Sequence, residues 1–335
     1  MEILEQIWST ALIASLVDTF QVLTIGFRSF EGDYIRMLAL IGFVIVLGAV
    51  LGGFMLDKGP LLVLFQPSEI IIIGGAALGT LLVANPIRVI KAIMKGAKGV
   101  LGSSPYTKKK YLSTLKMLFD LLSKARRLGM LGIETDIENP KESELFKAYP
   151  EFLKNHHHLE FVCDTMRMAV SGGVDPFDLD QLMERDIEVH HENMMEPVSS
   201  LATMADSLPG LGIVAAVLGV VITMGALDGP ASEIGHKVAA ALVGTFLGIL
   251  MCYGFIGPLN ANMGKRIAEE SAYLYVLRIV MISYVKGQPP VLAVEAGRRA
   301  IPAYARPNFA EVETACRGEA AGGAIAAEPE VAAQA

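Results

Sequence analysis

Histidine supplies the side chains of this chain that are best suited to binding a metal ion, and five of the six histidines lie in two short runs. Residues 156–158 are three consecutive histidines, which point in different directions on a helix and make a poor tridentate ligand. Asp186 and His190 stand four residues apart and can share a helix face, with His191 next to them, but two ligands do not complete a site. Both runs are interpreted as polar helix surfaces in contact with solvent.

Signatures of catalysis are missing from the sequence. The cysteines Cys163, Cys252 and Cys316 are far apart and form no CxxC pair, so neither a redox nor a zinc motif is predicted. The patterns GxxxxGK followed by Ser or Thr, GxSxG and HExxH, which are typical of nucleotide-binding and hydrolytic enzymes, do not occur. We therefore predict no catalytic residue, no metal site, no cofactor and no enzyme activity.

The composition favours a membrane protein. Of the 335 residues, 53% are apolar and only 19% are charged, whereas soluble domains average about 45–50% and about 25%. The mean hydropathy is +0.47 and the sequence pI is about 5.5. A net charge of −7 leaves no basic footprint for nucleic acid. These values exclude a disordered protein, a disulfide scaffold and a nucleic-acid binder.

Four apolar segments approach or exceed the length of about 20 residues that a helix needs to cross a bilayer. They are residues 37–56, 70–84, 208–227 and 238–264. The second is the shortest and would also fit a buried helix of a soluble domain, but spans lined by protein tolerate shorter runs. The sequence therefore predicts an all-α integral membrane protein whose four transmembrane helices form two hairpins.

The basic residues predict the orientation of these hairpins. Only Lys58 and Lys237 lie in the two short loops, whereas sixteen of the 28 Lys and Arg residues lie between the second and third spans. Because basic loops remain in the cytoplasm, we expect the short loops outside and the long loop and both termini inside.

The long loop, 88–203, is expected to fold by itself. One face of an amphipathic helix is predicted by five residues at helical spacing, Tyr111, Leu115, Leu118, Leu122 and Ala125. Gly129 can end this helix, and Asn139-Pro140 and Asp175-Pro176 each resemble a helix start. We predict a helical bundle over 88–203 and a second helical region over 265–316. A disordered tail is expected over 317–335.

No span carries a charged residue near its middle. An ion relay needs an ionisable or strongly polar group at depth, so the chain either moves no ions or relies on a partner for that group. Thr245 is the hydroxyl best placed at depth, although it can equally bond to the carbonyl four residues earlier. Pro209 and Pro258 each remove a backbone donor and can act as hinges. The small residues around them allow close helix packing, which is also their simplest explanation.

Several motifs resemble the MotA family of flagellar stator proteins, within the MotA/TolQ/ExbB superfamily. ALVGTFLGIL at 241–250, with Pro258 after it, resembles the family's fourth span, and DSLPG at 206–210 resembles the start of its third. The cytoplasmic run 126–146 and the sequences QPPVLAVEAGRRAI and ARPNF after the fourth span are also similar. The resemblance covers residues 37–313, with its motifs in the family's order.

The resemblance implies a pentameric ring of such chains around two copies of MotB, a single-span protein whose Asp accepts the ion. It implies that Pro209 and Pro258 couple ion flow to movement and that Thr245 lies near the MotB Asp. It also implies that Arg126 and Glu134 pair with charges on the rotor protein FliG. The expected function is that of a stator subunit in the bacterial inner membrane, which couples proton flow to torque for motility.

The conducted ion is expected to be a proton. A sodium ion must be held by several oxygens after it loses its water, whereas a proton needs one acceptor and a water path. Thr245 is followed by Phe246, where sodium-driven relatives tend to carry a second hydroxyl.

The first 36 residues precede the region of resemblance. Their apolar residues mark one face of an amphipathic helix but are too few to span a bilayer. The segment is predicted to be an interfacial helix on the cytoplasmic leaflet, or else the start codon is assigned too early and the chain begins at Met37.

Two other functions compete with the stator interpretation. One is a TolQ/ExbB-like transducer that energises an envelope process, against which the four spans and the run from Arg126 to Glu134 argue. The other is a passive membrane scaffold, which would not need hinge prolines.

Overall fold

The computed structural model describes residues 34–100, 102–225 and 230–317, which form helices and contain no strand. Four helices among them are long and apolar enough to cross a membrane, so the predicted fold class is confirmed. The helix predicted for the N-terminal extension falls on residues 1–36, of which 1–33 lie outside the described residues. The predicted tail lies outside them from residue 318.

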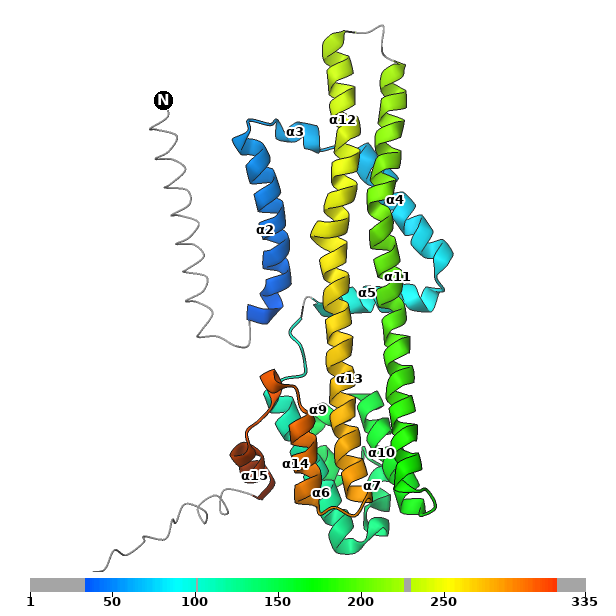
Figure 1. Cartoon of the computed structure of the whole chain (residues 1–335), viewed down its shortest axis with the longest axis vertical. Coiled ribbons are helices and arrows are strands. Elements are labelled where there is room, and N and C mark those ends of the chain that lie inside the picture. Colours follow the sequence, from blue (N-terminus) through cyan, green and yellow to red (C-terminus); the bar gives the residue numbers. More distant parts are fainter. Residues whose placement is uncertain (1–33, 101, 226–229, 318–335) are drawn as a thin grey trace, which may run out of the picture. The chain divides into compact units, whose positions relative to one another are not determined.

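The chain divides into two compact units, which are described separately. The first unit comprises residues 1–104 and 197–263, and the second comprises 105–196 and 264–335. The first contains α2 (Tyr34–Leu56), α3 (Leu61–Leu64), α4 (Pro67–Ala84), α5 (Ile87–Val100), α12 (Ala231–Leu250) and the π-helical turn η2 (Met251–Ile256). Two helices, α11 (Pro176–Met224) and α13 (Gly257–Val285), begin in one unit and end in the other. Within the first unit α11 and α12 run alongside each other (Figure 1).

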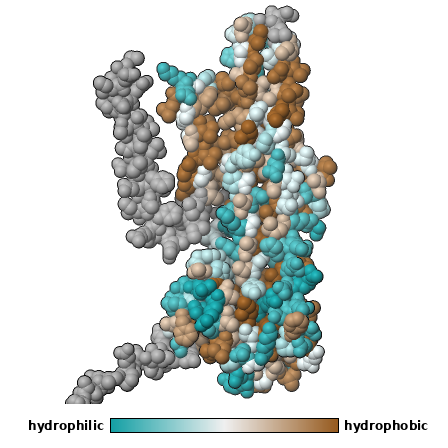
Figure 2. Space-filling model, in the orientation of Figure 1, coloured by the Kyte–Doolittle hydropathy of each residue, from teal (hydrophilic) through white to brown (hydrophobic). Residues whose placement is uncertain are grey.

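Apolar side chains dominate the exposed surface of the first unit (Figure 2). On α2 and α4, Val44, Ile71 and Val83 expose 68%, 71% and 91% of their surface, and on α11 Ile222 exposes 64%. A soluble monomer rarely exposes a continuous apolar patch of this kind. The exposed faces therefore fit lipid or neighbouring proteins, as four membrane spans require.

The second unit has its own buried core. It contains α6 (Lys108–Leu128), η1 (Met130–Ile133), α7 (Glu134–Glu138), α8 (Glu144–Lys147), α9 (Pro150–Leu153), α10 (His156–Ser171), α14 (Pro290–Ala300), η3 (Ala303–Ala305) and α15 (Phe309–Arg317). The five residues of the predicted amphipathic face in α6 are all buried in this core. The helical character predicted for this part of the chain is confirmed.

Two of the three helix boundaries predicted in the long loop, the end at Gly129 and the start at Asp175, are confirmed. Gly129 ends α6 with a φ of 80°, a region that residues with a side chain rarely adopt. Asp175 precedes α11, and its Oδ1 accepts a hydrogen bond from the Phe177 amide at 2.8 Å.

The helix start predicted at Asn139-Pro140 is wrong. Asn139 lies at the end of α7, and the next helix begins only at Glu144. Ser143 is the cap of that helix, and its hydroxyl donates to the buried carboxylate of Asp136 at 2.7 Å while accepting from the Phe146 amide. The tertiary bond to Asp136 fixes the start of α8 and overrides the Asn-Pro signal.

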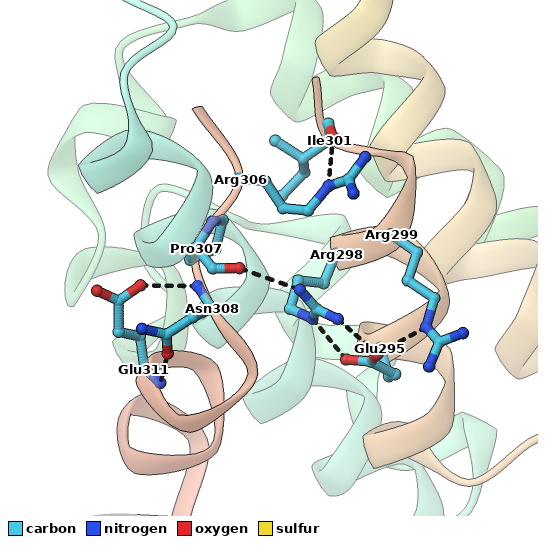
Figure 3. Close-up of polar contacts among 8 residues, drawn as sticks. All are labelled: Glu295, Arg298, Arg299, Ile301, Arg306, Pro307, Asn308 and Glu311. Carbon is cyan, nitrogen blue, oxygen red and sulfur yellow. Dashed lines mark hydrogen bonds and ion pairs between the residues drawn. The ribbon is translucent and has the colours of Figure 1, made fainter. Parts of the chain in front are cut away.

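The sequence motifs that follow the fourth span form a polar network that joins α14 to the segment before α15 (Figure 3). Glu295 accepts bonds from Arg298 at 2.7 and 2.8 Å and from Arg299 at 2.8 Å. Arg298 also donates to the Pro307 carbonyl at 3.2 Å. This motif is explained by the packing of the second unit, because each of its charges has a partner within the same segment.

Candidate functional site

The central packing surface of the first unit is a glycine-lined contact between α11 and α12. A Cβ on Gly212 would lie 2.9 Å from the Gly244 carbonyl oxygen, and one on Gly248 would lie 2.6 Å from the Leu208 carbonyl oxygen. The two backbones therefore approach so closely that only glycine fits, and the close packing predicted for the small residues is confirmed.

Thr245 lies on this packed pair of helices and is partly exposed. Its hydroxyl forms no hydrogen bond with any other described residue, so the alternative bond to the Ala241 carbonyl is not present. Thr223 on α11 provides a contrast, because its hydroxyl donates to the Gly219 carbonyl at 2.8 Å. The Thr245 hydroxyl thus remains able to bind an ion, a water or a partner group.

Pro209 lies inside α11, next to the same contact. Because proline has no amide hydrogen, the Ala205 carbonyl cannot receive the usual bond from residue 209. The preceding residue, Leu208, is buried, and its carbonyl faces the position of Gly248 on α12. The proline therefore weakens the backbone ladder of α11 where α11 meets α12.

Pro258 is the second residue of α13 and follows the π-helical turn η2. A π-turn inserted in a helix is often found at functional positions, and here it comes before a residue that cannot donate to the Gly254 carbonyl. On α2, Phe43 stacks on Phe255 of this turn with ring centroids 5.3 Å apart. A cavity of about 230 Å³ between α2 and the turn is lined in part by Phe43, Gly254 and Pro258.

The first unit also holds an acid that the sequence analysis treated only as the boundary of a span. Glu69 lies in the first turn of α4 and exposes only 5% of its surface. Its carboxyl faces Gly244 of α12, the residue that precedes Thr245. The prediction that no span carries a charged residue near its middle is not contradicted, because Glu69 lies in the first turn of α4, but the start of this helix does bury an ionisable group. The hydropathy pattern placed Glu69 at the edge of the apolar run, whereas helix packing places it among the other spans.

The two residues predicted to contact the rotor protein lie on either side of a turn in the second unit. Arg126 is in the last turn of α6, and Glu134 is the first residue of α7. The chain reverses at Gly129 between them, and Ile133 is buried in the core beneath. Both charged side chains are exposed and neither has an ion-pair partner among the described residues, so both are available to another protein.

Sequence reasoning missed the apolar residues of this turn. Leu128 and Leu131 expose 57% and 71% of their surface between the two charges. The nearby Asp136 is buried, and Lys124 binds it at 2.6 Å, so this pair holds the turn in place. The unusual feature is that two leucines are exposed between Arg126 and Glu134, which the hydrophobic periodicity of the sequence does not reveal.

The histidine runs differ from the predicted solvated surfaces. His156 is exposed, but His158 is fully buried, and His157 stacks on His190 with ring centroids 3.8 Å apart. Glu270 Oε1 lies 3.6 Å from His158 Nε2 and 3.5 Å from His190 Nε2. The interpretation as polar surface is therefore wrong for these residues, because α10 packs against α11 and α13 there. In the described part of the chain no group of three or more ligating side chains is placed to hold a metal ion.

Four apolar helices, a glycine-packed pair of spans and a separate helical unit define a multi-span α-helical membrane protein. The family model described as the MotA/TolQ/ExbB proton channel family matches residues 153–274, and the model of the N-terminal part of motility protein A matches residues 40–129. Relatives sharpen this assignment. "Motility protein A" of Escherichia coli K12 is 43% identical over 277 residues, which cover 83% of this chain and 94% of the relative. "Chemotaxis protein LafT" of Vibrio parahaemolyticus is 36% identical over 277 residues, or 83% and 97% of the two chains. The chain belongs to the motility protein A (MotA) family.

Solved structures agree with this fold. The chain matches a subunit of the Campylobacter jejuni MotAB structure with a TM-score of 0.66 and 20% identity, over 80% of this chain and 96% of that one. It matches the MotAB stator complex of Bacillus subtilis with a TM-score of 0.64 and 23% identity, over 79% and 96%.

Proposed function

We propose that the chain is a flagellar stator subunit that couples ion flow across the inner membrane to torque on the rotor. The observation that carries this proposal is the 43% identity to a motility protein A along nearly the whole relative, across spans and cytoplasmic unit alike. The unpaired Thr245 hydroxyl beside a glycine-packed helix contact supports an ion path in the same chain.

A single-span partner similar to MotB supplies the ion-binding Asp beside Thr245. One hydroxyl cannot by itself accept and release protons near neutral pH, so a carboxyl group from another chain completes the path. Several copies of the chain surround the partner, and the family resemblance favours five. Both solved neighbours are described as MotAB assemblies, which supports a partner of this kind.

The turn between Arg126 and Glu134 is the contact with the rotor protein FliG. Its two exposed charges are free to pair with charges of opposite sign, and Leu128 and Leu131 add apolar surface between them.

Movement starts at the two prolines, Pro209 and Pro258, where the helix backbone lacks a hydrogen bond. The conducted ion is a proton. Both termini and the turn face the cytoplasm, as the basic residues predict.

A motility test decides between this function and its alternative. The chain is deleted and restored as wild type, Thr245→Val or the control Thr223→Val, whose hydroxyl only bonds its own helix. We expect the deletion to abolish swimming, Thr245→Val to lower swimming speed and proton flux strongly at unchanged membrane level, and Thr223→Val to stay near wild type. A deletion strain that swims normally but loses an envelope process would instead favour the TolQ/ExbB-like function. Swimming that required sodium at constant pH and resisted a protonophore would overturn the choice of ion.

A further inference from the structure

A carboxyl group lies where α4, α11 and α12 meet. Glu69 of α4 is 95% buried, since 5% of its surface is exposed. A Cβ placed on Gly244 of α12 would stand 2.6 Å from Glu69 Oε2 and 3.2 Å from the Cβ of Ala215 on α11. The carboxyl therefore fills the space that Gly244 leaves open, with spans on more than one side of it.

This position adjoins the ion-path candidate. Gly244 directly precedes Thr245, and a Cβ on Gly212 of α11 would contact the backbone of both residues, at 2.9 and 3.3 Å. Glu69 and Thr245 therefore belong to the same packed region, one contributed by α4 and the other by α12.

Glu69 does not serve as a helix cap. An acid at the third position of a helix commonly bonds back to the N-cap residue, and Glu311 of α15 does so, accepting from the Asn308 amide at 2.8 Å (Figure 3). The N-cap of α4 is Gln66, which has no side-chain capping bond. Glu69 Oε2 has no hydrogen-bond partner among the described residues.

The acid also occupies an apolar position of its helix. The buried residues of α4 recur every four positions, Glu69, Ile73, Ala77 and Leu81. Ile73 and Ala77 belong to an apolar cluster with Leu208 and Ala215 of α11. An apolar side chain would pack at position 69 with less cost, because an ionised carboxylate in such surroundings must be neutralised by a cation.

We propose that Glu69 is a second proton-carrying group of the ion path, acting in series with the partner's carboxyl beside Thr245. The proposal rests on the proposed stator function. A proton from the outer side adds to the Glu69 carboxylate, and the O–H bond then breaks as the proton passes to the partner's carboxylate. The entering proton comes from hydronium, whose O–H bond breaks as the bond to Glu69 forms. The partner's acid then loses its proton to water on the inner side, so both carboxylates are restored and no other bond changes.

The test compares Glu69→Gln, Glu69→Asp and the matched control Glu233→Gln in the full chain co-expressed with its single-span partner. Glu233 is an exposed acid at the start of α12 that pairs with Lys237 at 3.0 Å. Proton uptake is measured in cells or vesicles under an imposed gradient, together with membrane level and co-purification of the partner. We expect Glu69→Gln to assemble normally but to lower the flux by about tenfold or more. Glu69→Asp should recover part of the flux, and Glu233→Gln should conduct like wild type.

The outcomes separate this proposal from the function on which it rests. Wild-type flux in assembled Glu69→Gln complexes overturns the role of Glu69 and leaves the stator function intact. A wild-type complex that passes sodium but no protons overturns the choice of ion and the role of Glu69, and one that passes neither ion overturns the stator function itself.

If Glu69→Gln does not accumulate in the membrane, the unsubstituted complex decides. Dicyclohexylcarbodiimide reacts with carboxyl groups in their acid form in apolar surroundings, and the modified residues are mapped by mass spectrometry. A Glu69 adduct that forms in parallel with loss of flux supports the proposal. A Glu69 that stays unmodified while flux is lost through the partner's carboxyl overturns it.

Discussion

Arg126 is a candidate for the rotor contact whose position also has a structural explanation. Its guanidinium lies near the C-terminus of α6, where the helix dipole favours a cation in any case. It is nevertheless exposed and has no ion-pair partner among the described residues. Arg127 is also exposed in the same turn and can share the contact.

We expect Arg126→Ala to reduce swimming speed only in part, because a single exposed charge pair contributes about 0–1 kcal/mol. Arg126→Glu should reduce it further, since it adds repulsion. Arg185→Ala is the control, because Arg185 is an exposed arginine of α11 that pairs with Glu188 at 2.7 Å. The electrostatic interpretation is wrong if Arg126→Ala stops the motor outright while a charge reversal on the rotor fails to rescue Arg126→Glu.

Gly244 gives a second prediction at the residue scale. Alanine favours helix by about 1 kcal/mol over glycine, so Gly244→Ala would be neutral or stabilising if the site were open. The added Cβ would instead lie 2.6 Å from Glu69 Oε2 and 3.3 Å from the Ala216 amide nitrogen. We expect loss of swimming, and Gly235→Ala is the control because nothing lies within 4 Å of that position. Swimming at the wild-type rate in Gly244→Ala cells would show that the carboxyl is not held there.

At the scale of elements, the turn η2 and Pro258 together form the proposed hinge. The π-turn inserts an extra residue into the helical path, and the proline denies the Gly254 carbonyl its donor. Pro258→Ala returns that donor and favours a regular helix. We expect normal membrane levels but slow or absent swimming, measured against Pro197→Ala, which alters another proline inside a helix. If Pro258→Ala is silent, the hinge role and the need for a moving stator both fail, and a passive scaffold is favoured.

The packing of α10 predicts a pH dependence. Burial lowers the pKa of His158 and of His157, and for His158 the effect of burial exceeds the opposing effect of Glu270. A histidine with a lowered folded-state pKa binds its proton more readily when unfolded, so its contribution to stability is complete above the unfolded pKa of about 6.5. That contribution is lost as the pH falls below this value. Unfolding of the purified chain at pH 7.5 and 5.5 should show this loss.

Substitution identifies the group responsible. His158→Leu should flatten the dependence of stability on pH, whatever it does to stability at pH 7.5. His156→Gln, which alters the exposed neighbour, should leave the dependence unchanged. A dependence on pH that is equal in both variants would assign it to other groups.

Elements were predictable from the sequence where one local signal decided them. The face of α6, its end at Gly129 and the start of α11 at Asp175 each follow from spacing or a cap. The start of α8 was not predictable, because it depends on a bond between Ser143 and Asp136, seven residues apart and both buried.

The site residues divide in the same way. Thr245 and the two prolines are candidates that residue type and apolar context indicate from the sequence alone. Glu69 could not, since its burial depends on α4 entering the space beside Gly244, which no pattern within α4 reports. The burial of His158 could not be predicted for the same reason, because its partners Glu270 and Tyr273 lie on α13.

At the scale of the whole molecule, the predicted topology can be tested directly. Asp57 lies in the turn after α2 and Lys154 in the second unit, and both are exposed. A membrane-impermeant maleimide applied to intact cells should label Asp57→Cys but not Lys154→Cys, which should label only after lysis. The unsubstituted chain is the control for background labelling. Its Cys163 and Cys252 are buried, whereas Cys316 in the second unit is partly exposed and sets the background after lysis. Labelling of Lys154→Cys in intact cells would contradict the orientation.

The first span, α2, differs from the other three in what holds it. Its apolar window buries none of its residues within the chain, and Phe43 and Val46 meet the turn η2 across only a small surface. In a single copy of this protein the first helix therefore packs against little of its own chain, and its apolar surface must be covered by lipid or by a neighbouring protein. Its survival in the cell then depends on copy number and membrane thickness as well as on its own sequence. Cells that make too few copies, or bilayers that fit the span badly, should degrade it before any motor is assembled.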